Sequence, residues 1–153
     1  MLLANMSVAQ QIAMKLPEQA LLRRHENPIE RRLVVVKKRA ERLGYSINTS
    51  SVFAVMKSLQ SVSDEAVRNL LVLLLSKVVP TAKYFCAGML DIAKYQHYAL
   101  NSPLYTHFTS PLRRYCDIIV HRQMEAVIHG AGSETKFSMD RDSVAKIAQL
   151  CNM

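Results

Sequence analysis

The chain has 153 residues, of which 50% are hydrophobic and 21% are charged, and its formal net charge at pH 7 is +8. This length and hydrophobic content suffice for the core of one domain and exclude an intrinsically disordered chain. The positive charge indicates a polyanionic partner, for which nucleic acid is the simplest candidate.

The sequence indicates neither a membrane segment nor a disulfide framework. The longest apolar run, residues 70–75, is far too short to span a bilayer, and no basic segment precedes an apolar stretch at the N-terminus. The cysteines, Cys86, Cys116 and Cys151, are odd in number and widely spaced, which favours reduced thiols. We therefore expect a cytoplasmic protein without membrane contact.

The first fifteen residues are predicted to form a helix that ends at Leu16-Pro17. Its apolar residues recur at helical spacing and would share one face: Leu2, Met6, Ala9 and Ala13. The helix has no start signal, so we expect the chain to open partway through an element. Asn5 is expected to have a structural hydrogen-bonding role.

The next two segments carry many of the basic residues. Residues 20–25 are expected to form a turn that brings Leu21 and Leu22 inward and leaves Arg23, Arg24 and His25 near the surface. A basic amphipathic helix is predicted from an Asn-Pro start at residue 27 to a glycine stop at residue 44. Eight Lys or Arg and three Glu lie between residues 23 and 42, so this segment is either a solvated face or a surface that follows phosphates.

Two further helices are predicted between residues 48 and 80. Residues 48–51 cap the first, whose inward residues should be Phe53, Met56 and Leu59. Ser63 is predicted to cap the second, which has acidic residues in its first turn and ends before Pro80. Its buried stripe is expected to contain Val67, Leu70, Leu71, Leu74 and Val78.

Short strands are expected in the rest of the chain, before two more helices. They are predicted over residues 82–88, 97–100 and 104–108, the last because side chains alternate there with a period of two. Ser110-Pro111 is predicted to start a helix, and a loop over residues 130–137 to precede a final helix over residues 138–153. The predicted fold class is α+β, predominantly α-helical with a few short antiparallel strands.

Arg113 and Arg114 stand out because they would lie in the first turn of the helix that begins at Ser110-Pro111. A helix N-terminus carries partial positive charge and favours acidic residues. Two guanidinium groups beside free backbone N–H groups indicate an anion site of the phosphate-binding kind. The alternative is a surface ion pair between Arg113 and Asp117. We expect His121 to hydrogen-bond to Asp117.

The longest motif is Tyr105-Thr-His-Phe-Thr-Ser-Pro-Leu-Arg-Arg-Tyr-Cys-Asp, followed by Val120-His-Arg. It resembles the signature of the ribonuclease II family catalytic domain, the RNB domain of 3'-to-5' exoribonucleases. Further segments resemble this family in the same order: Met1-Leu-Leu-Ala-Asn, Ala20-Leu-Leu-Arg-Arg-His, and Ala82-Lys-Tyr-Phe with His97-Tyr-Ala-Leu. The resemblance extends to about His129, so residues 1–153 would form the C-terminal part of an RNB domain. It is greatest to the eukaryotic exosome-independent branch and its fungal pseudo-nuclease relatives.

This resemblance implies a 3'-to-5' exoribonuclease that hydrolyses single-stranded RNA with Mg2+. It matches Arg113 to the family's catalytic arginine, which holds the scissile phosphate. The other RNA-contacting positions would be Tyr105, Thr109, Ser110, Arg114, Arg23 and Arg24. The family's metal-binding aspartates would lie before residue 1, with the upstream half of the domain and OB-type domains. No metal ligand is assigned within the chain, so we expect the chain alone to be inactive.

Two other functions stay open at this point. One is a non-catalytic RNA-binding pseudo-nuclease that acts as a translational repressor, as in the fungal branch that the chain resembles. The other is a basic helical interaction domain without an RNA function. The acidic residues upstream of residue 1 would distinguish the nuclease from the pseudo-nuclease, because exonucleolytic hydrolysis of this type needs clustered carboxylates that bind divalent ions.

Overall fold

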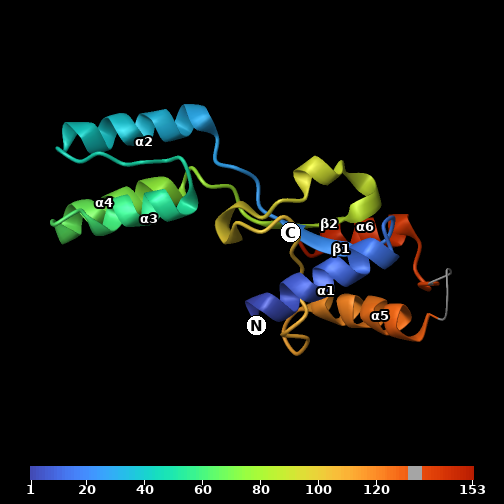
Figure 1. Cartoon of the computed structure of the whole chain (residues 1–153). Helices are drawn as coiled ribbons and strands as arrows, with labels where there is room; N and C mark the ends of the chain where they lie inside the picture. The colour runs from blue at the N-terminus through green and yellow to red at the C-terminus, as the bar shows by residue number, and fades with distance from the viewer. Residues whose placement is uncertain (131–135) are drawn as a thin grey trace. The chain divides into compact units, whose positions relative to one another are not determined.

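The structure, a computed structural model, describes residues 1–130 and 136–153 (Figure 1). It contains two compact units. One joins Met1–His25 to Ala82–Met153, and the other is the intervening segment Glu26–Thr81. Residues 131–135, in the middle of the loop predicted over 130–137, lie outside the described residues. Within the described part of the chain, none of the helices has the length and apolar content needed to cross a membrane.

The first unit is built around a two-stranded antiparallel sheet. β1 (Leu21–Arg24) pairs with β2 (Lys83–Cys86), so that Leu21 lies opposite Cys86. The α-helices described in this unit are α1 (Leu2–Lys15), α5 (Tyr115–His129) and α6 (Arg141–Leu150). Single-turn 3-10 helices follow β2, namely η1 (Ala87–Met89), η2 (Ile92–Lys94) and η3 (Tyr98–Leu100). The predicted α+β class, mainly helical with short antiparallel strands, is confirmed.

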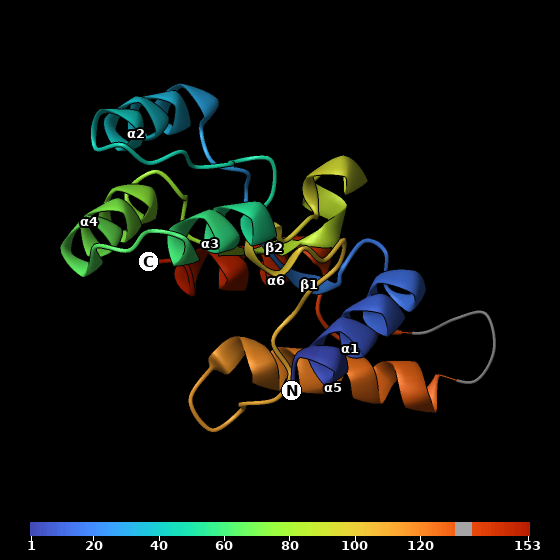
Figure 2. The same cartoon turned by 60° about the vertical axis from the view of Figure 1, so that its left-hand side comes forward.

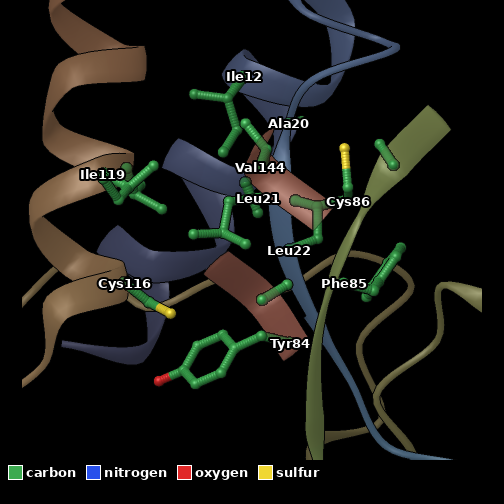
Figure 3. Packing of buried hydrophobic residues seen from close by; sticks show 14 of the residues in the cluster. Ile12, Ala20, Leu21, Leu22, Tyr84, Phe85, Cys86, Cys116, Ile119 and Val144 are labelled. Carbon is green, nitrogen blue, oxygen red and sulfur yellow. The ribbon is translucent and has the colours of Figure 1, made fainter. Parts of the chain in front are cut away.

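Apolar side chains from three helices and both strands form the core of this unit (Figure 3). The largest fully buried ones include Ile12, Leu21, Ile119 and Val144. Burial of a side chain of this size contributes roughly 1.5–3 kcal/mol, whereas an isolated pair of strands is only marginally stable. The packed helices therefore hold the sheet together. α1 and α5 lie side by side in both views (Figure 1 and Figure 2).

The buried face of α1 is rotated from the predicted one. Leu2 is exposed, and the side chains that turn inward are Asn5, Val8, Ala9 and Ile12. These four positions follow the spacing of three and four residues that places side chains on one helix face. The face against α5 therefore contains a buried amide, which the apolar pattern alone did not indicate.

Two buried polar side chains fasten neighbouring segments to β1. Gln123 of α5 accepts a hydrogen bond from the Leu21 N–H at 3.0 Å and donates one to the Gln19 carbonyl at 2.6 Å. The hydroxyl of Thr106 donates to the Leu21 carbonyl at 2.7 Å. Because a buried polar group without a partner costs about 1–3 kcal/mol, these bonds fix α5 and residues 105–108 against the sheet.

Three predictions for the segments around the sheet are wrong, and one is confirmed. Residues 104–108 do not form a strand, because they reach the β1 backbone through one bond from the Arg23 N–H to the Tyr105 carbonyl and through the Thr106 side chain. Residues 98–100 form η3 instead of a strand, and residues 21–24 form β1 instead of a turn. The strand predicted within residues 82–88 is confirmed as β2.

The second unit contains α2 (Glu30–Arg42), α3 (Val52–Gln60) and α4 (Glu65–Ser76). α4 contacts both of the other helices. Its core is formed mainly by residues from these helices and the turns beside them: Val36, Ala40, Ile47, Leu59, Val62, Leu71, Leu75 and Val78. Gly44 follows α2 with φ 84°, the left-handed conformation that glycine adopts most easily at a helix end, as predicted.

The exposed apolar residues of the second unit correct the predicted stripes. Phe53 and Met56 were expected to face inward but are 77% and 54% exposed, and Leu70 is 45% exposed. In α3 only Leu59 is buried, and Val55 packs against the same core while partly exposed. Helical spacing identified the helices but not the width of their buried faces.

Helix starts follow the local hydrogen-bonding chemistry only in part. The Ser51 hydroxyl caps α3 as predicted, accepting a hydrogen bond from a first-turn N–H at 3.1 Å. Asp64, not Ser63, caps α4, and Asp140 caps α6, which starts at Arg141 rather than at Ser138. A carboxylate is the better cap where both are available, because its charge also complements the helix dipole.

Candidate nucleic-acid interface

The segment around Ser110-Pro111 forms a turn, so the predicted helix start is wrong. The N–H of Arg113 donates to the Ser110 carbonyl at 3.3 Å, which places Pro111 at the second position of a turn, where its fixed φ is favourable. Arg114 is extended, with φ −135° and ψ 117°, and α5 begins at Tyr115. Both arginines therefore precede the helix and do not lie in its first turn.

The Asp117 carboxylate holds this turn in place. Its side chain is fully buried, and its oxygens accept hydrogen bonds from the Ser110 N–H at 2.8 Å and from Nε and Nη2 of Arg114, each at 2.7 Å. The two Arg114 bonds form the bidentate geometry that makes arginine-carboxylate pairs strong. The ion pair considered between Arg113 and Asp117 is therefore wrong, because Arg114 occupies that carboxylate.

The two arginines of the turn, Arg113 and Arg114, differ in their charged neighbours. Arg114 is partly exposed, and its charge is neutralised by Asp117. Arg113 is exposed, and its guanidinium group has no acidic partner within the part of the chain that the structure describes. Thr109 and Ser110 are partly exposed on the same turn. Of the two predicted arginines, Arg113 is therefore the one that the turn presents to an anion.

Asn5 and Tyr105 hold the segment that leads into the turn. Nδ2 of Asn5 donates to the Tyr105 hydroxyl at 2.9 Å, and Oδ1 of Asn5 accepts the Phe108 N–H at 3.0 Å. The structural hydrogen-bonding role predicted for Asn5 is confirmed. Tyr105, assigned above to RNA contact, is 5% exposed, so its ring positions the chain that leads to the turn.

Arg23 of β1 lies near the same turn. Its guanidinium carbon is 4.5 Å from the centre of the Tyr84 ring, a cation-π contact, and it has no carboxylate partner among the described residues. Arg24 follows it at the end of the strand and is also partly exposed. Because successive strand side chains point to opposite faces, only one of these two arginines can share a face with the Tyr84 ring.

Tyr84 contacts both Arg23 and His107, and sequence reasoning did not assign a role to Tyr84 or His107. The Tyr84 hydroxyl lies 2.6 Å from Nδ1 of His107. Burial raises the pKa of Tyr84 to about 12, so the hydroxyl keeps its proton, and the tautomer of His107 decides which of the two atoms donates. Burial, followed by the charges of Arg114 and Arg23, lowers the pKa of His107 to about 4. Both residues belong to motifs identified in the sequence, which gave no indication of their contact.

The predicted hydrogen bond between His121 and Asp117 is wrong. Nε2 of His121 donates to the Phe108 carbonyl at 2.8 Å, and its ring stacks on the Phe108 ring with centroids 4.1 Å apart. The Asp117 carboxylate is already occupied by Arg114 and the Ser110 N–H. His121 therefore fixes Phe108 against α5.

The described residues do not form a site for the divalent ion that the resemblance implies. No group of three or more His, Cys, Asp or Glu side chains is placed to hold a metal ion in residues 1–130 and 136–153. Mg2+ needs several oxygen ligands in close to octahedral geometry, and only Asp117 lies at the turn, where two other groups use its oxygens. The donor set of the described residues does not fit a magnesium site.

Comparison with known proteins finds a matching domain family, similar curated proteins and similar solved structures. The sequence profile of the RNB domain matches residues 1–130. Protein SSD1 of Saccharomyces cerevisiae is 40% identical over 148 residues, which cover 97% of this chain and 12% of that protein. DIS3-like exonuclease 2 of Xenopus tropicalis is 43% identical over 158 residues, which cover 99% of this chain and 19% of that protein.

Two solved structures share the fold. The structure described as yeast Ssd1, a pseudonuclease, superposes with a TM-score of 0.87 at 40% identity, over 97% of this chain and 18% of that chain. Mycoplasma genitalium RNase R in complex with ribose methylated single-stranded RNA superposes with a TM-score of 0.74 at 26% identity, over 99% of this chain and 24% of that chain. The chain thus spans a quarter or less of the length of these proteins.

Replacement of Asp117 by asparagine should destabilise the first unit. The variant removes the charge that neutralises Arg114, whose side chain is only 23% exposed, and we expect the free energy of unfolding to fall by about 3 kcal/mol. Asp142→Asn is the matched control, because Asp142 is exposed and its ion pair with Arg141 is 3.7 Å long. Urea unfolding measures both. Equal losses in the two variants would contradict the role of Asp117.

Stability should decrease as the pH falls from about 6.5 to about 4. The folded chain holds His107 with a pKa of about 4 instead of 6.5, so the unfolded chain binds more protons in this range and gains stability relative to the folded chain. His97 has the same shift, also caused mainly by burial. Unfolding midpoints across this range should fall less steeply for His107→Gln than for the unmodified chain, with His129→Gln as an exposed control. An unchanged slope in His107→Gln would disprove this assignment.

Proposed function

Because the chain belongs to the RNB domain family, we propose that it is part of a 3'-to-5' exoribonuclease of the ribonuclease II type, in which Arg113 holds the scissile phosphate of single-stranded RNA. The observation that carries the proposal is the position of Arg113. Its guanidinium group is exposed and without an acidic partner among the described residues, on a turn fixed by a fully buried carboxylate. Such a cation is available to an external anion.

The chemistry of guanidinium supports this role. A planar guanidinium group donates two parallel hydrogen bonds to phosphate oxygens, and its charge offsets the negative charge that develops on the phosphate during hydrolysis. The Asp117 carboxylate and the proline turn set the direction of the Arg113 backbone before RNA arrives. Less conformational freedom is then lost on binding, which favours affinity.

Arg23 would provide a second contact to the RNA backbone. It is partly exposed, and its cation-π contact with Tyr84 holds the guanidinium group without neutralising it. In our proposal Thr109 and Ser110 lie against the RNA beside Arg113, whereas Tyr105 and Arg114 act by positioning the turn. The solved RNase R complex contains single-stranded RNA, which agrees with the substrate class that we propose for this chain.

In this proposal the requirement for Mg2+ is inferred only from the family. The described residues do not provide its ligands, so the contribution of this chain is to bind and orient the phosphate. We propose that parts of the protein outside these 153 residues supply the carboxylates that bind Mg2+. The same parts would contain the other half of the domain and the OB-type domains.

A second function is favoured by a specific observation. The yeast Ssd1 structure, described as a pseudonuclease, superposes on the chain with a TM-score of 0.87. In this alternative the same arginines bind RNA, but no phosphodiester bond is broken. The phosphate-binding role of Arg113 is common to both functions.

Replacement of Arg113 by alanine should weaken RNA binding by about 10- to 100-fold, because a charge-assisted contact with phosphate contributes about 1.5–3 kcal/mol. The slope of log affinity against log salt should also fall by about 0.7, the value for one phosphate contact with single-stranded RNA. Fluorescence anisotropy with a labelled oligonucleotide at several salt concentrations measures both. Arg122→Ala, an exposed arginine of α5, is the charge-matched control, and equal losses in the two variants would indicate diffuse attraction rather than a phosphate site.

The 153-residue chain should not shorten RNA from its 3' end, even with Mg2+ supplied, because its described carboxylates do not form a metal site. Incubation with an RNA labelled at its 5' end, followed by gel electrophoresis, tests this expectation. Progressive shortening that stops on addition of a chelator would contradict it. In the longer protein, hydrolysis that Arg113→Ala abolishes would support the nuclease, and RNA binding without hydrolysis would support the pseudo-nuclease.

A further inference from the structure

The side chain of His107 is held in one orientation by its neighbours. Its Nδ1 lies 2.6 Å from the Tyr84 hydroxyl. Its ring meets the rings of Tyr84 and Tyr105 edge to face, with centroids 5.5 Å and 5.6 Å apart. One hydrogen bond and two aromatic contacts restrict the rotation of the side chain. The direction in which the second ring nitrogen, Nε2, points is therefore set before any ligand arrives.

This second nitrogen is open to a partner. The His107 ring is partly exposed, and within residues 1–130 and 136–153 its Nε2 forms no hydrogen bond. Among the described side chains that are not exposed, the only buried nitrogen or oxygen atom without a partner is Nδ1 of His97. Nε2 of His107 is consequently in contact with solvent, where a group from outside the chain can reach it.

The ring lies among the groups proposed to bind RNA. Tyr84, which holds Nδ1 of His107, also has the guanidinium carbon of Arg23 at 4.5 Å from its ring centre. The Arg23 N–H donates to the Tyr105 carbonyl at 2.8 Å, so the segment that contains His107 lies against β1. The turn that presents Arg113 follows this segment in the sequence. Phosphates and riboses alternate along RNA, so a strand bound by these arginines also brings riboses to this place.

The protonation of the ring indicates which group of the RNA it matches. Burial, followed by the charges of Arg114 and Arg23, lowers the pKa of His107 to about 4, so the ring is neutral at pH 7. In a neutral imidazole Nε2 is a donor in one tautomer and an acceptor in the other. A phosphate oxygen only accepts and fits one tautomer. A ribose 2'-hydroxyl donates and accepts, so it fits both.

We propose that Nε2 of His107 hydrogen-bonds to a ribose 2'-hydroxyl and that this contact makes the chain prefer RNA to DNA. This assignment rests on the proposed function, because it needs a strand bound at the turn of Arg113. The arginines contact phosphates, which DNA also contains, so they contribute affinity without this preference. The 2'-hydroxyl is the group that DNA lacks. The expected preference is about two- to tenfold in affinity, the range for one neutral hydrogen bond.

Fluorescence anisotropy with a labelled RNA and with its 2'-deoxy counterpart of the same base sequence tests the proposal. The unmodified chain should bind the RNA more tightly by about two- to tenfold. His107→Phe keeps an aromatic ring and removes both nitrogens. It should weaken the binding of RNA by this factor and leave the affinity for the deoxy strand unchanged, which would also show that the variant is folded.

Two further variants separate the hydrogen bond from other effects. His107→Gln has a side chain with a donor and an acceptor, and it should retain part of the preference for RNA. His129→Phe replaces an exposed histidine of α5 and should leave both affinities unchanged. A preference that arises from sugar conformation alone would persist in His107→Phe.

Equal affinities of the unmodified chain for the two strands would overturn the assignment, and so would a preference that His107→Phe leaves intact. The first of these measurements needs no variant, so it decides even if His107→Phe does not fold. RNA binding that depends on Arg113 but shows no preference for RNA would overturn the assignment alone. A chain that binds neither strand would overturn the proposed function itself.

Discussion

The buried carboxylate of Asp117 is the interaction on which the candidate site depends. A fully buried charge is stable only when it is paired and hydrogen-bonded, and Asp117 meets this requirement with the Arg114 guanidinium group and the Ser110 N–H. The same three bonds close the turn between residues 110 and 114 at both ends. The need to satisfy one charge thus fixes a turn on which Arg113 is exposed and has no acidic partner among the described residues.

The rest of the first unit provides the platform for this turn. Gln123 and Thr106 bond to the β1 backbone, and Asn5 bonds to Tyr105 and Phe108, so α1, α5 and the sheet all contribute to its position. Most of these groups are buried amides or hydroxyls with specific partners. Because a buried polar group that loses its partner is costly, the arrangement has few alternatives and suits a site that must present a guanidinium group in one direction.

The charges of this chain suit phosphate binding better than metal chemistry. Arg113 and Arg23 have no carboxylate partners among the described residues and are available to an anion, whereas Arg114 is neutralised by Asp117. The chain matches the RNB domain and resembles both an exonuclease and a pseudonuclease of that family. A phosphate clamp is useful to either, because RNA must be held whether or not it is cut.

The sequence alone determined the family, the α+β class and most of the helices, because helical spacing, turn residues and a long motif are local properties of the chain; it also drew attention to Arg113. It also indicated the structural role of Asn5. It misplaced the start of α5, the partner of Asp117 and the bond of His121, and it did not reveal the contact of Tyr84 with His107. Only the tertiary structure decided these, because burial determines which charge must be neutralised and packing determines which distant side chains meet.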